Sequence, residues 1–165
     1  MNWILDTNIF INAVQKYYGL DLCPGFWQWL LQHTDCIYTI DMVEEELADK
    51  DDELFTWCKE QLPSSFFRHA DEEVMSCYKK VVSHVMALPD PPFNQNKKDD
   101  FINGADPMLI AFAMKTGDVL VTNEKFNPDA HKKIYLPNIA KEFDVKFTDI
   151  FDVMRRLEAK LVLEQ

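Results

Sequence analysis

The sequence lacks the features of a membrane-spanning, secreted or disulfide-stabilised protein. No apolar run approaches the roughly 18 residues that a membrane-spanning helix needs. The first residues contain no basic side chain and Asp6 interrupts their apolar run, so no secretory leader is recognisable. The four cysteines are widely separated and form no Cys-x-x-Cys pair, which predicts reduced thiols and neither a disulfide framework nor a zinc site. We therefore expect a cytoplasmic protein that does not bind a membrane.

Basic residues are also scarce relative to acidic ones. The chain of 165 residues has 17 Lys and Arg against 28 Asp and Glu, a formal net charge of −11. Much of the excess lies between Asp41 and Glu53, where Lys50 is the one basic residue. Such a surplus argues against purely charge-driven binding to nucleic acid, which needs a basic surface. It remains compatible with an enzyme that meets phosphate through metal ions, or with a basic partner protein.

The order of apolar patterns predicts one α/β domain over residues 1–165. Hydrophobic residues make up 47% of the chain, enough for a substantial core. Short β-type runs alternate with helical patterns, which favours a three-layer α/β/α fold with a mainly parallel sheet. Strands are expected up to Leu5 and at Cys36–Ile40, 118–121 and Val145–Phe147. Helices are expected at Ile9–Tyr18, from Pro24, from Asp41, at Asp51–Gln61, Asp71–Met86 and Asp106–Met114, after Pro137, and at Asp149–Leu163.

The segment from Pro89 to Gly104 is predicted to be one long irregular loop. It is rich in proline at its start and continues with polar and charged residues. Long loops in compact domains are usually functional or mobile. Lys97 and Lys98 in this segment are therefore candidates for contact with an anionic substrate, although a solvated loop tip would explain them as well.

Four acids fall at strand ends or at the starts of helices beside the sheet. Asp6 and Glu124 each follow an apolar strand pattern, and Asp106 precedes the proline of an apolar helix. Glu46 lies toward the apolar side of its helix. Asp106 could simply be an N-cap, and Glu46 the margin of a solvated acidic face. Because open α/β folds bind ligands at the carboxyl ends of their strands, we expect the four carboxylates to form one pocket.

Such a pocket predicts a bound cation. Two carboxylates about 5 Å apart repel each other by roughly 3 kcal/mol at an effective dielectric constant of about 20. A cluster of four is therefore stable only when it is partly protonated or holds cations. All-oxygen ligands favour Mg²⁺ or Mn²⁺ over zinc. One or two such ions, with open positions for water, make a site for phosphodiester hydrolysis.

Four ordered segments resemble the acidic motifs of PIN-domain proteins. The resemblance covers residues 1 to about 150, and its segments are Leu5-Asp6-Thr7-Asn8, Val43-Glu44-Glu45-Glu46-Leu47, Ala105-Asp106-Pro107-Met108-Leu109-Ile110-Ala111 and Val121-Thr122-Asn123-Glu124-Lys125-Phe126. It implies a twisted parallel sheet between helices and a metal-dependent ribonuclease. In bacteria such proteins are commonly the toxin of a toxin–antitoxin pair, neutralised by a small cognate antitoxin, and they often form homodimers.

The resemblance also implies roles for individual residues. Asp6, Glu46 and Asp106 match the first three family acids, and Glu124 falls where the family more often has aspartate. Glu124 therefore either ligates a metal directly or acts through water. The neighbouring polar residues expected to support these acids or the phosphate are Thr7, Asn8, Thr122 and Asn123, and Lys125 joins Lys97 and Lys98 as a candidate for phosphate contact. The chain departs from the family pattern in its alanine before Asp106, its proline after it and a larger middle section.

Two other functions remain open. A noncatalytic interaction module could keep the same fold and only bind a partner. A Mg²⁺-dependent phosphomonoester hydrolase of the haloacid-dehalogenase type also uses a strand-end aspartate, but within an Asp-x-Asp motif. Asn8 occupies the second position of that motif here, which argues against this enzyme. The sequence thus predicts Mg²⁺- or Mn²⁺-dependent hydrolysis of RNA as the function.

Overall fold

A parallel sheet between two layers of helices forms the centre of the computed structural model, which describes residues 1–50 and 52–163. Within these residues the sheet has five strands in the order β3-β2-β1-β4-β5, and each neighbouring pair is parallel. The strands are β1 (Trp3–Leu5), β2 (Ile37–Ile40), β3 (Phe67–Arg68), β4 (Val119–Val121) and β5 (Phe147–Thr148). The predicted α/β/α fold class is confirmed, and β5 is the edge strand that the sequence predicts.

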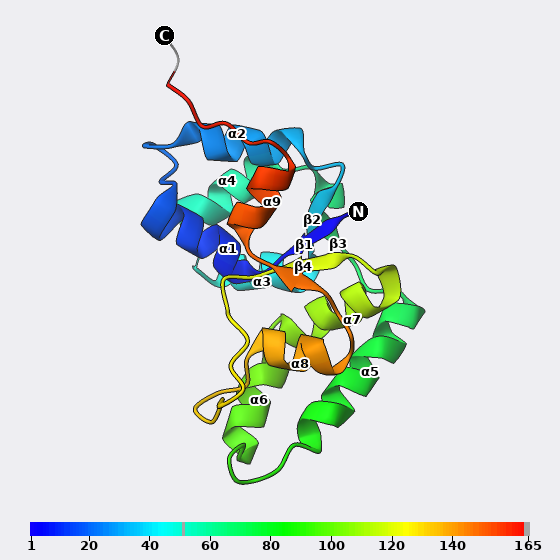
Figure 1. Cartoon of the computed structure of the whole chain (residues 1–165). Coiled ribbons are helices and arrows are strands. Elements are labelled where there is room, and N and C mark those ends of the chain that lie inside the picture. Colours follow the sequence, from blue (N-terminus) through cyan, green and yellow to red (C-terminus); the bar gives the residue numbers. More distant parts are fainter. Residues whose placement is uncertain (51, 164–165) are drawn as a thin grey trace.

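The helices divide between the two sides of the sheet (Figure 1). One layer contains α1 (Thr7–Asn12) with its π-helical continuation η1 (Ala13–Tyr17), α2 (Pro24–Gln32), α4 (Glu53–Gln61) and α9 (Ile150–Arg156). The other contains α5 (Glu72–Met86), α6 (Gln95–Asn103), α7 (Asp106–Thr116) and α8 (Leu136–Glu142). A helix, α3 (Asp41–Lys50), starts where β2 ends, and the short 3₁₀ helix η2 (Ser64–Phe66) leads into β3. No helix in the described part of the chain is long and apolar enough to cross a membrane.

The direction of chain progression reverses between β1 and β4. From β1 the chain moves outward to β2 and β3, then returns through α5, α6 and α7 to add β4 on the other side of β1. Leu5 is paired with Val121 across this junction. In open parallel sheets, such a reversal leaves a crevice at the carboxyl ends of the strands. The residues that directly follow the two strands, Asp6 and Thr122, therefore lie at the mouth of this crevice.

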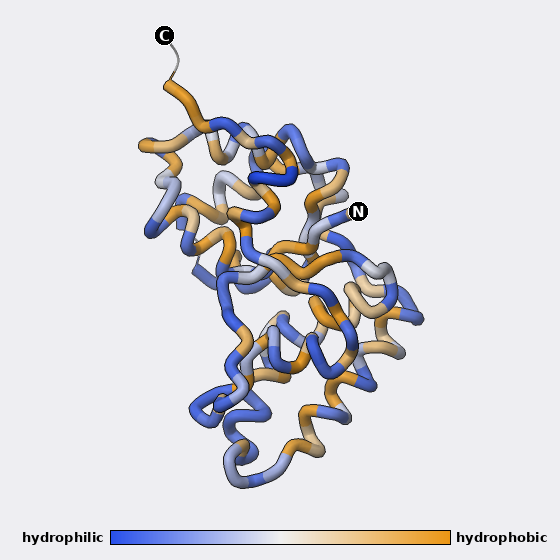
Figure 2. Tube along the Cα trace, viewed as in Figure 1, coloured by the Kyte–Doolittle hydropathy of each residue, from blue (hydrophilic) through white to orange (hydrophobic). Residues whose placement is uncertain are grey.

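The core explains why α7 is central. Its residues from Pro107 to Ala113 are buried, and the hydropathy trace in Figure 2 shows apolar residues concentrated there and in the strands. α7 packs along α5 and also contacts β4. The helix ends at Gly117, whose φ of 75° is a left-handed conformation that glycine adopts without steric cost. Packing against α5 and β4 holds α7 in place. Its first residue, Asp106, therefore has a defined position at the edge of the sheet.

The prediction of a long irregular loop from Pro89 to Gly104 is wrong. Residues Gln95–Asn103 form α6, and the Asn94 side chain caps it by accepting the backbone N–H of Lys97. Lys98 and Phe101 are the buried residues of this helix. A helix with so few buried residues has no apolar periodicity, so its cap is the one local signal that predicts it.

Two helix boundaries also differ from the predictions. The last helix ends at Arg156, although Asp149 caps it as expected by accepting the N–H of Asp152 at 2.8 Å. Helix α4 begins at Glu53, and Asp52 caps it. Asp51, its predicted first residue, lies outside the described residues. Such ends are set by local capping bonds that a periodic pattern does not contain.

We expect Lys98 to stabilise the fold. Its side chain is buried, and Nζ donates hydrogen bonds to the carbonyl oxygens of Met86 (3.0 Å) and Leu88 (2.6 Å) at the end of α5. Lys98→Met keeps the apolar stem and leaves both carbonyls without a donor, so the free energy of unfolding should fall by about 2 kcal/mol. Urea unfolding measures this, with exposed Lys80→Met as the matched control. Equal stability of the two variants would contradict the capping role.

Candidate active site

Asp6 occupies the centre of the crevice. It directly follows β1, and its backbone N–H donates to the carbonyl of Val121 at the end of β4. Its side chain is only 3% exposed, and Oδ2 accepts a hydrogen bond of 2.9 Å from the hydroxyl of Thr122. Burial raises the pKa of Asp6 from 3.8 to about 6; the Thr122 hydrogen bond opposes this, while the charges of Glu124 and Glu46 add to it.

Asp106 meets Asp6 from the first turn of α7. It is the first residue of the helix, and Ala105 precedes it as the N-cap, so the reading of Asp106 as a capping residue is wrong. Burial raises the pKa of Asp106 well above its usual range, and the charges of Asp6, Glu124 and Glu46 raise it further. The opposing influence is the positive charge of Lys133. Asp6 and Asp106 thus form the electrostatic centre of the site.

Glu46 turns inward from α3, as its place on the apolar side of the helix predicts. One carboxylate oxygen accepts a hydrogen bond from the Thr7 hydroxyl, and the other accepts the backbone N–H of Ala105 at 2.8 Å. Gly104 lies against the same group, since a Cβ there would approach Oε1 of Glu46 to 3.4 Å. Glu46 therefore ties α3 both to α1 and to the segment that leads into Asp106.

Glu124 is held differently from the other three acids. Its Oε1 accepts a hydrogen bond from Lys133 Nζ at 2.6 Å, and its Oε2 accepts the backbone N–H of Leu136 at the start of α8 at 3.0 Å. Only 13% of its side chain is exposed. Both oxygens are therefore already engaged, and its charge is balanced by Lys133.

These side chains border two adjoining hollows. The acidic cleft has a volume of about 390 Å³, and its lining includes Asp6, Glu46, Asp49, Asp100 and Asp106. The basic groove has a volume of about 210 Å³, and its lining includes Lys97, Lys132 and Lys133. The two share Asp100, Phe101 and Asp106. An anion that enters the basic groove would therefore reach the carboxylate of Asp106.

The donor set suits a hard divalent cation that keeps part of its water shell. Among the described residues, no group of three or more His, Cys, Asp or Glu side chains is arranged to hold a metal ion. In the same site, Glu46 and Glu124 have hydrogen-bond partners on both oxygens. The pKa of Asp106, in contrast, responds to burial and charge alone. Since Mg²⁺ is usually bound by one or two carboxylates together with water and phosphate, Asp6 and Asp106 fit it.

The supporting polar residues take several roles. Thr122 donates to Asp6 and accepts the backbone N–H of Glu124 at 3.1 Å, and Thr7 holds Glu46. Asn8 lines the acidic cleft, and its carbonyl accepts a long hydrogen bond of 3.4 Å from the side-chain amide of Asn123. Thr7, Asn8 and Thr122 therefore lie at the acids or their cleft, whereas Asn123 contacts Asn8 and lines a different cavity.

The three candidate lysines differ in their surroundings. Lys98 is buried and bound to carbonyl oxygens of α5 and the residue after it, so it does not face the acidic cleft. Lys97 lies at the basic groove, where Nζ donates to the carbonyls of Pro92 and His131. Lys125 is exposed and lies at a different cavity on the far side of Thr122.

Sequence reasoning missed Lys132, Lys133 and Asp100 at the site. Lys132-Lys133 is a basic pair in an acidic chain, which is a usable signal, but it stands in an irregular segment after the fourth acidic motif, with no periodic pattern to place it. Asp100 was assigned to the supposed loop instead of to α6. Both omissions concern segments whose position depends on tertiary packing.

A family model described as a domain of unknown function, DUF4411, matches residues 3–161 of the chain. Among solved structures, the chain is similar to one in the crystal structure of VapBC2 from Rickettsia felis bound to a DNA fragment from their promoter. The identity is 14%, the TM-score is 0.51, and the match covers 90% of this chain and 98% of that one. At this identity the likeness shows the fold alone. No curated protein matches the sequence.

The raised pKa of Asp6 predicts a pH-dependent loss of stability in metal-free protein. A carboxyl whose pKa is higher in the folded state destabilises that state above the raised pKa and has no such effect below the ordinary one. The change from 3.8 to about 6 corresponds to roughly 3 kcal/mol. We expect Asp6→Asn to be more stable than wild type by up to about this amount at pH 7–8, with the difference shrinking as pH falls from 6 to 4.

Chemical unfolding in EDTA at a series of pH values measures the difference. The exposed Asp21→Asn variant is the matched control and should follow wild type throughout. A constant difference between Asp6→Asn and wild type from pH 4 to pH 8 would mean that the Asp6 charge does not destabilise the fold.

Proposed function

The chain belongs to the DUF4411 family, and we propose that it is a Mg²⁺- or Mn²⁺-dependent ribonuclease that hydrolyses RNA phosphodiesters. The observation that carries this proposal is the pairing of two carboxylates, those of the buried Asp6 and the partly buried Asp106, at the point where the sheet reverses its order. The charges of these two acids destabilise the metal-free fold. We therefore infer that the two acids serve to bind a ligand. A divalent cation together with a phosphate group meets that requirement.

Asp6 and Asp106 would hold the ion, and Glu46 and Glu124 would complete the acidic surroundings. When bound, such an ion supplies Lewis-acid activation of water and neutralises charge that develops on the phosphate. The Thr122 hydroxyl fixes the orientation of Asp6, and the backbone N–H of Ala105 fixes Glu46 beside it. The chain's own contribution is therefore a prearranged set of carboxylates in a site partly shielded from water.

The basic groove gives this acidic protein a local means of receiving RNA. Lys132 and Lys133 are exposed at its wall, and the groove meets the acidic cleft at Asp106. Lys133 is paired with Glu124, so its ammonium group is held near Asp106 before any substrate arrives. A phosphate in the groove would share Lys133 with Glu124, and the remaining negative charge of the site would be offset by the ion.

We further propose that the protein is the toxin of a bacterial toxin–antitoxin pair. The resemblance to PIN-domain proteins and the similarity to a VapBC2 structure support this role. A partner segment rich in Arg and Lys would suit the acidic cleft and could block it, and a homodimer remains part of the proposal. A noncatalytic interaction module is the second candidate, because Glu124 is already paired with Lys133 and would need to release it to bind a metal directly.

RNase activity should require both aspartates and a divalent ion. We expect Asp6→Asn and Asp106→Asn to reduce cleavage of single-stranded RNA in Mg²⁺ or Mn²⁺ by at least about a hundredfold, since each removes a charge that holds the ion. Cleavage assays with well-purified protein and calorimetric titration of Mn²⁺ provide the measurements.

The exposed Asp21→Asn variant controls for general effects of the substitution and should retain both cleavage and Mn²⁺ binding. Full cleavage by Asp6→Asn would refute the catalytic assignment. Absence of cleavage by wild type, with metal binding also absent, would favour the noncatalytic module.

The basic groove should contribute to substrate binding. Lys132→Ala and Lys133→Ala are expected to raise KM several-fold and to reduce its dependence on salt, because each removes one contact with phosphate. Steady-state cleavage at several salt concentrations measures both effects, and exposed Lys80→Ala on α5 is the control. If KM and its salt dependence match wild type in both variants, RNA does not pass through the basic groove.

A further inference from the structure

A second cavity lies on the other side of Thr122 from the acidic cleft. Its volume is about 480 Å³, within the range of small-molecule and cofactor sites. Its walls come from η1, the end of β4, β5 and α9, and we call it the aromatic pocket. The residues that define it are Tyr17, Thr122, Phe126, Phe147 and Phe151.

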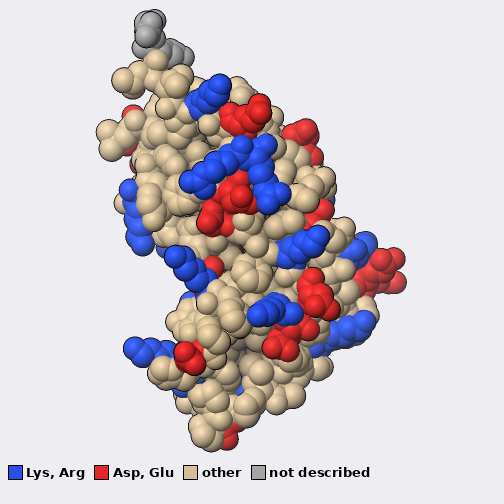
Figure 3. All heavy atoms as spheres, viewed as in Figure 1, with Lys and Arg blue, Asp and Glu red and all other residues tan. Residues whose placement is uncertain are grey.

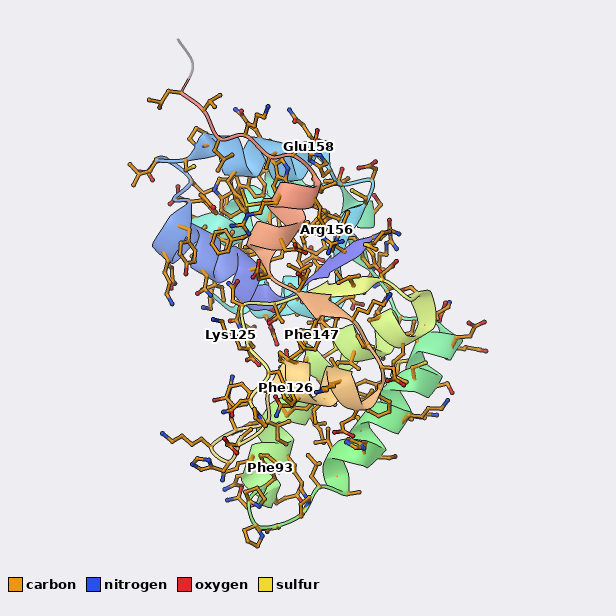
Figure 4. The ribbon with its side chains drawn as sticks, in the orientation of Figure 1. Phe93, Lys125, Phe126, Phe147, Arg156 and Glu158 are labelled. Atoms are coloured by element: carbon orange, nitrogen blue, oxygen red, sulfur yellow. The ribbon has the colours of Figure 1, made fainter. Side chains whose placement is uncertain are left out.

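Two aromatic rings of this pocket, those of Tyr17 and Phe126, are open to solvent. Tyr17 is 54% exposed and Phe126 is 40% exposed, and both are among the exposed large hydrophobic residues of the chain. The Tyr17 ring meets the edge of Phe151 at a centroid distance of 5.5 Å. Phe147 lies on β5 opposite Leu120 of β4, and Phe126 comes from the segment that follows β4 (Figure 4). Exposed rings gathered around a cavity offer flat apolar surface that the protein itself leaves uncovered.

Core packing accounts for part of this cluster but not for its rim. Phe147 and Phe151 are partly buried and pack against the hydrophobic core, so they anchor the pocket floor. Tyr17 and Phe126 stand above that floor. Lys141 Nζ lies 4.2 Å from the centroid of the Phe126 ring, which helps to hold the ring in place from one side. The pocket thus combines two rings that pack against the core with two rings that are exposed to solvent.

The pocket lining contains one basic residue, Lys125, and two acids that already have partners: Glu124 is bound to Lys133, and Asp149 caps α9. Lys125 is exposed and lines the pocket, and Figure 4 shows it beside the aromatic side chains. Figure 3 shows Lys and Arg side chains at several places on this face despite the net negative charge of the chain. A nucleotide combines a planar base with a phosphate, and both parts have a counterpart here.

The pocket is also continuous with the proposed active site. Thr122 lines it and donates a hydrogen bond to Asp6, and Glu124 lines it while bound to Lys133. The pocket and the proposed active site are therefore linked through Thr122 and Glu124. Single-stranded RNA is commonly recognised by stacking its unpaired bases on aromatic side chains.

We propose that the aromatic pocket binds a nucleobase of single-stranded RNA, next to the phosphate that the acidic site attacks. This inference rests on the proposed ribonuclease function and adds the substrate subsite. Tyr17 and Phe126 stack on the base, and Lys125 contacts an adjoining phosphate. An aromatic or basic side chain of a partner protein is the rival occupant, and it would show no dependence on a base.

The test compares ligands that differ only in the base. Adenosine, guanosine, cytidine and uridine 5′-monophosphates are titrated against the full chain in Mg²⁺, and ribose 5-phosphate is the matched ligand without a base. NMR of ¹³C-labelled Phe and Tyr rings reports contact, and the same titrations give Kd. At least one monophosphate should bind about fivefold or more tightly than ribose 5-phosphate, as a stacked base requires, and should shift the Phe126 and Tyr17 signals.

Two variants make the assignment specific. Phe126→Leu and Tyr17→Leu keep apolar volume but remove the ring, so the preference for the monophosphate should fall to less than about twofold. Phe93→Leu, a partly buried ring in the half of the molecule around α6, is the control and should keep the preference. Melting temperatures verify that all three variants fold.

The outcomes separate this inference from the ribonuclease proposal. Equal binding of the monophosphates and ribose 5-phosphate, no binding of any of them, or a preference that survives both ring removals would overturn the pocket assignment, whatever the cleavage assays show. A base preference that is lost in Phe126→Leu and Tyr17→Leu would support it. If wild type then fails to cleave RNA, the pocket remains a nucleotide site and only the ribonuclease proposal falls.

Discussion

The mutual repulsion of clustered carboxylates is the constraint on which the rest of the site depends. Asp6 and Asp106 come from distant parts of the chain, and the fold places Asp6 in a buried position and Asp106 in a partly buried one. The raised pKa of each reports the free energy that this placement costs. A stable fold can carry such a cost only if the rest of the domain is well packed, and the buried α7 and the central strands provide that packing.

Neighbouring groups reduce this destabilisation to a different extent for each of the four carboxylates. Thr122 donates to Asp6, while Glu46 is neutralised in part by a hydroxyl and a backbone N–H, and Glu124 by the ammonium group of Lys133. The two glutamates are therefore more fully compensated than Asp106. That asymmetry supports the proposal that Asp106, together with Asp6, holds a cation.

The arrangement also reconciles an acidic protein with an anionic substrate. The acidic cleft shares Asp106 with the basic groove, which has Lys132 and Lys133, and Thr122 of the aromatic pocket donates to Asp6 of the cleft. Long-range repulsion from the net charge of −11 is screened at physiological salt, where the Debye length is about 8 Å. Local contacts with phosphate and base can then decide where RNA lies, in accord with the proposed function.

The sequence by itself determined the parts that depend on local pattern. Apolar runs located β1, β2 and β4, the acids after them marked the sheet edge, and the inward position of Glu46 followed from helical spacing. Tertiary structure alone decided which groups meet across the fold: Lys133 with Glu124, Lys98 with the end of α5, and the rings of the aromatic pocket. Helix α6 was hidden as well, because a helix with few buried residues shows no apolar period. Periodicity records which side of an element is buried, but the partner of a polar side chain is set by packing between elements that lie far apart in the chain.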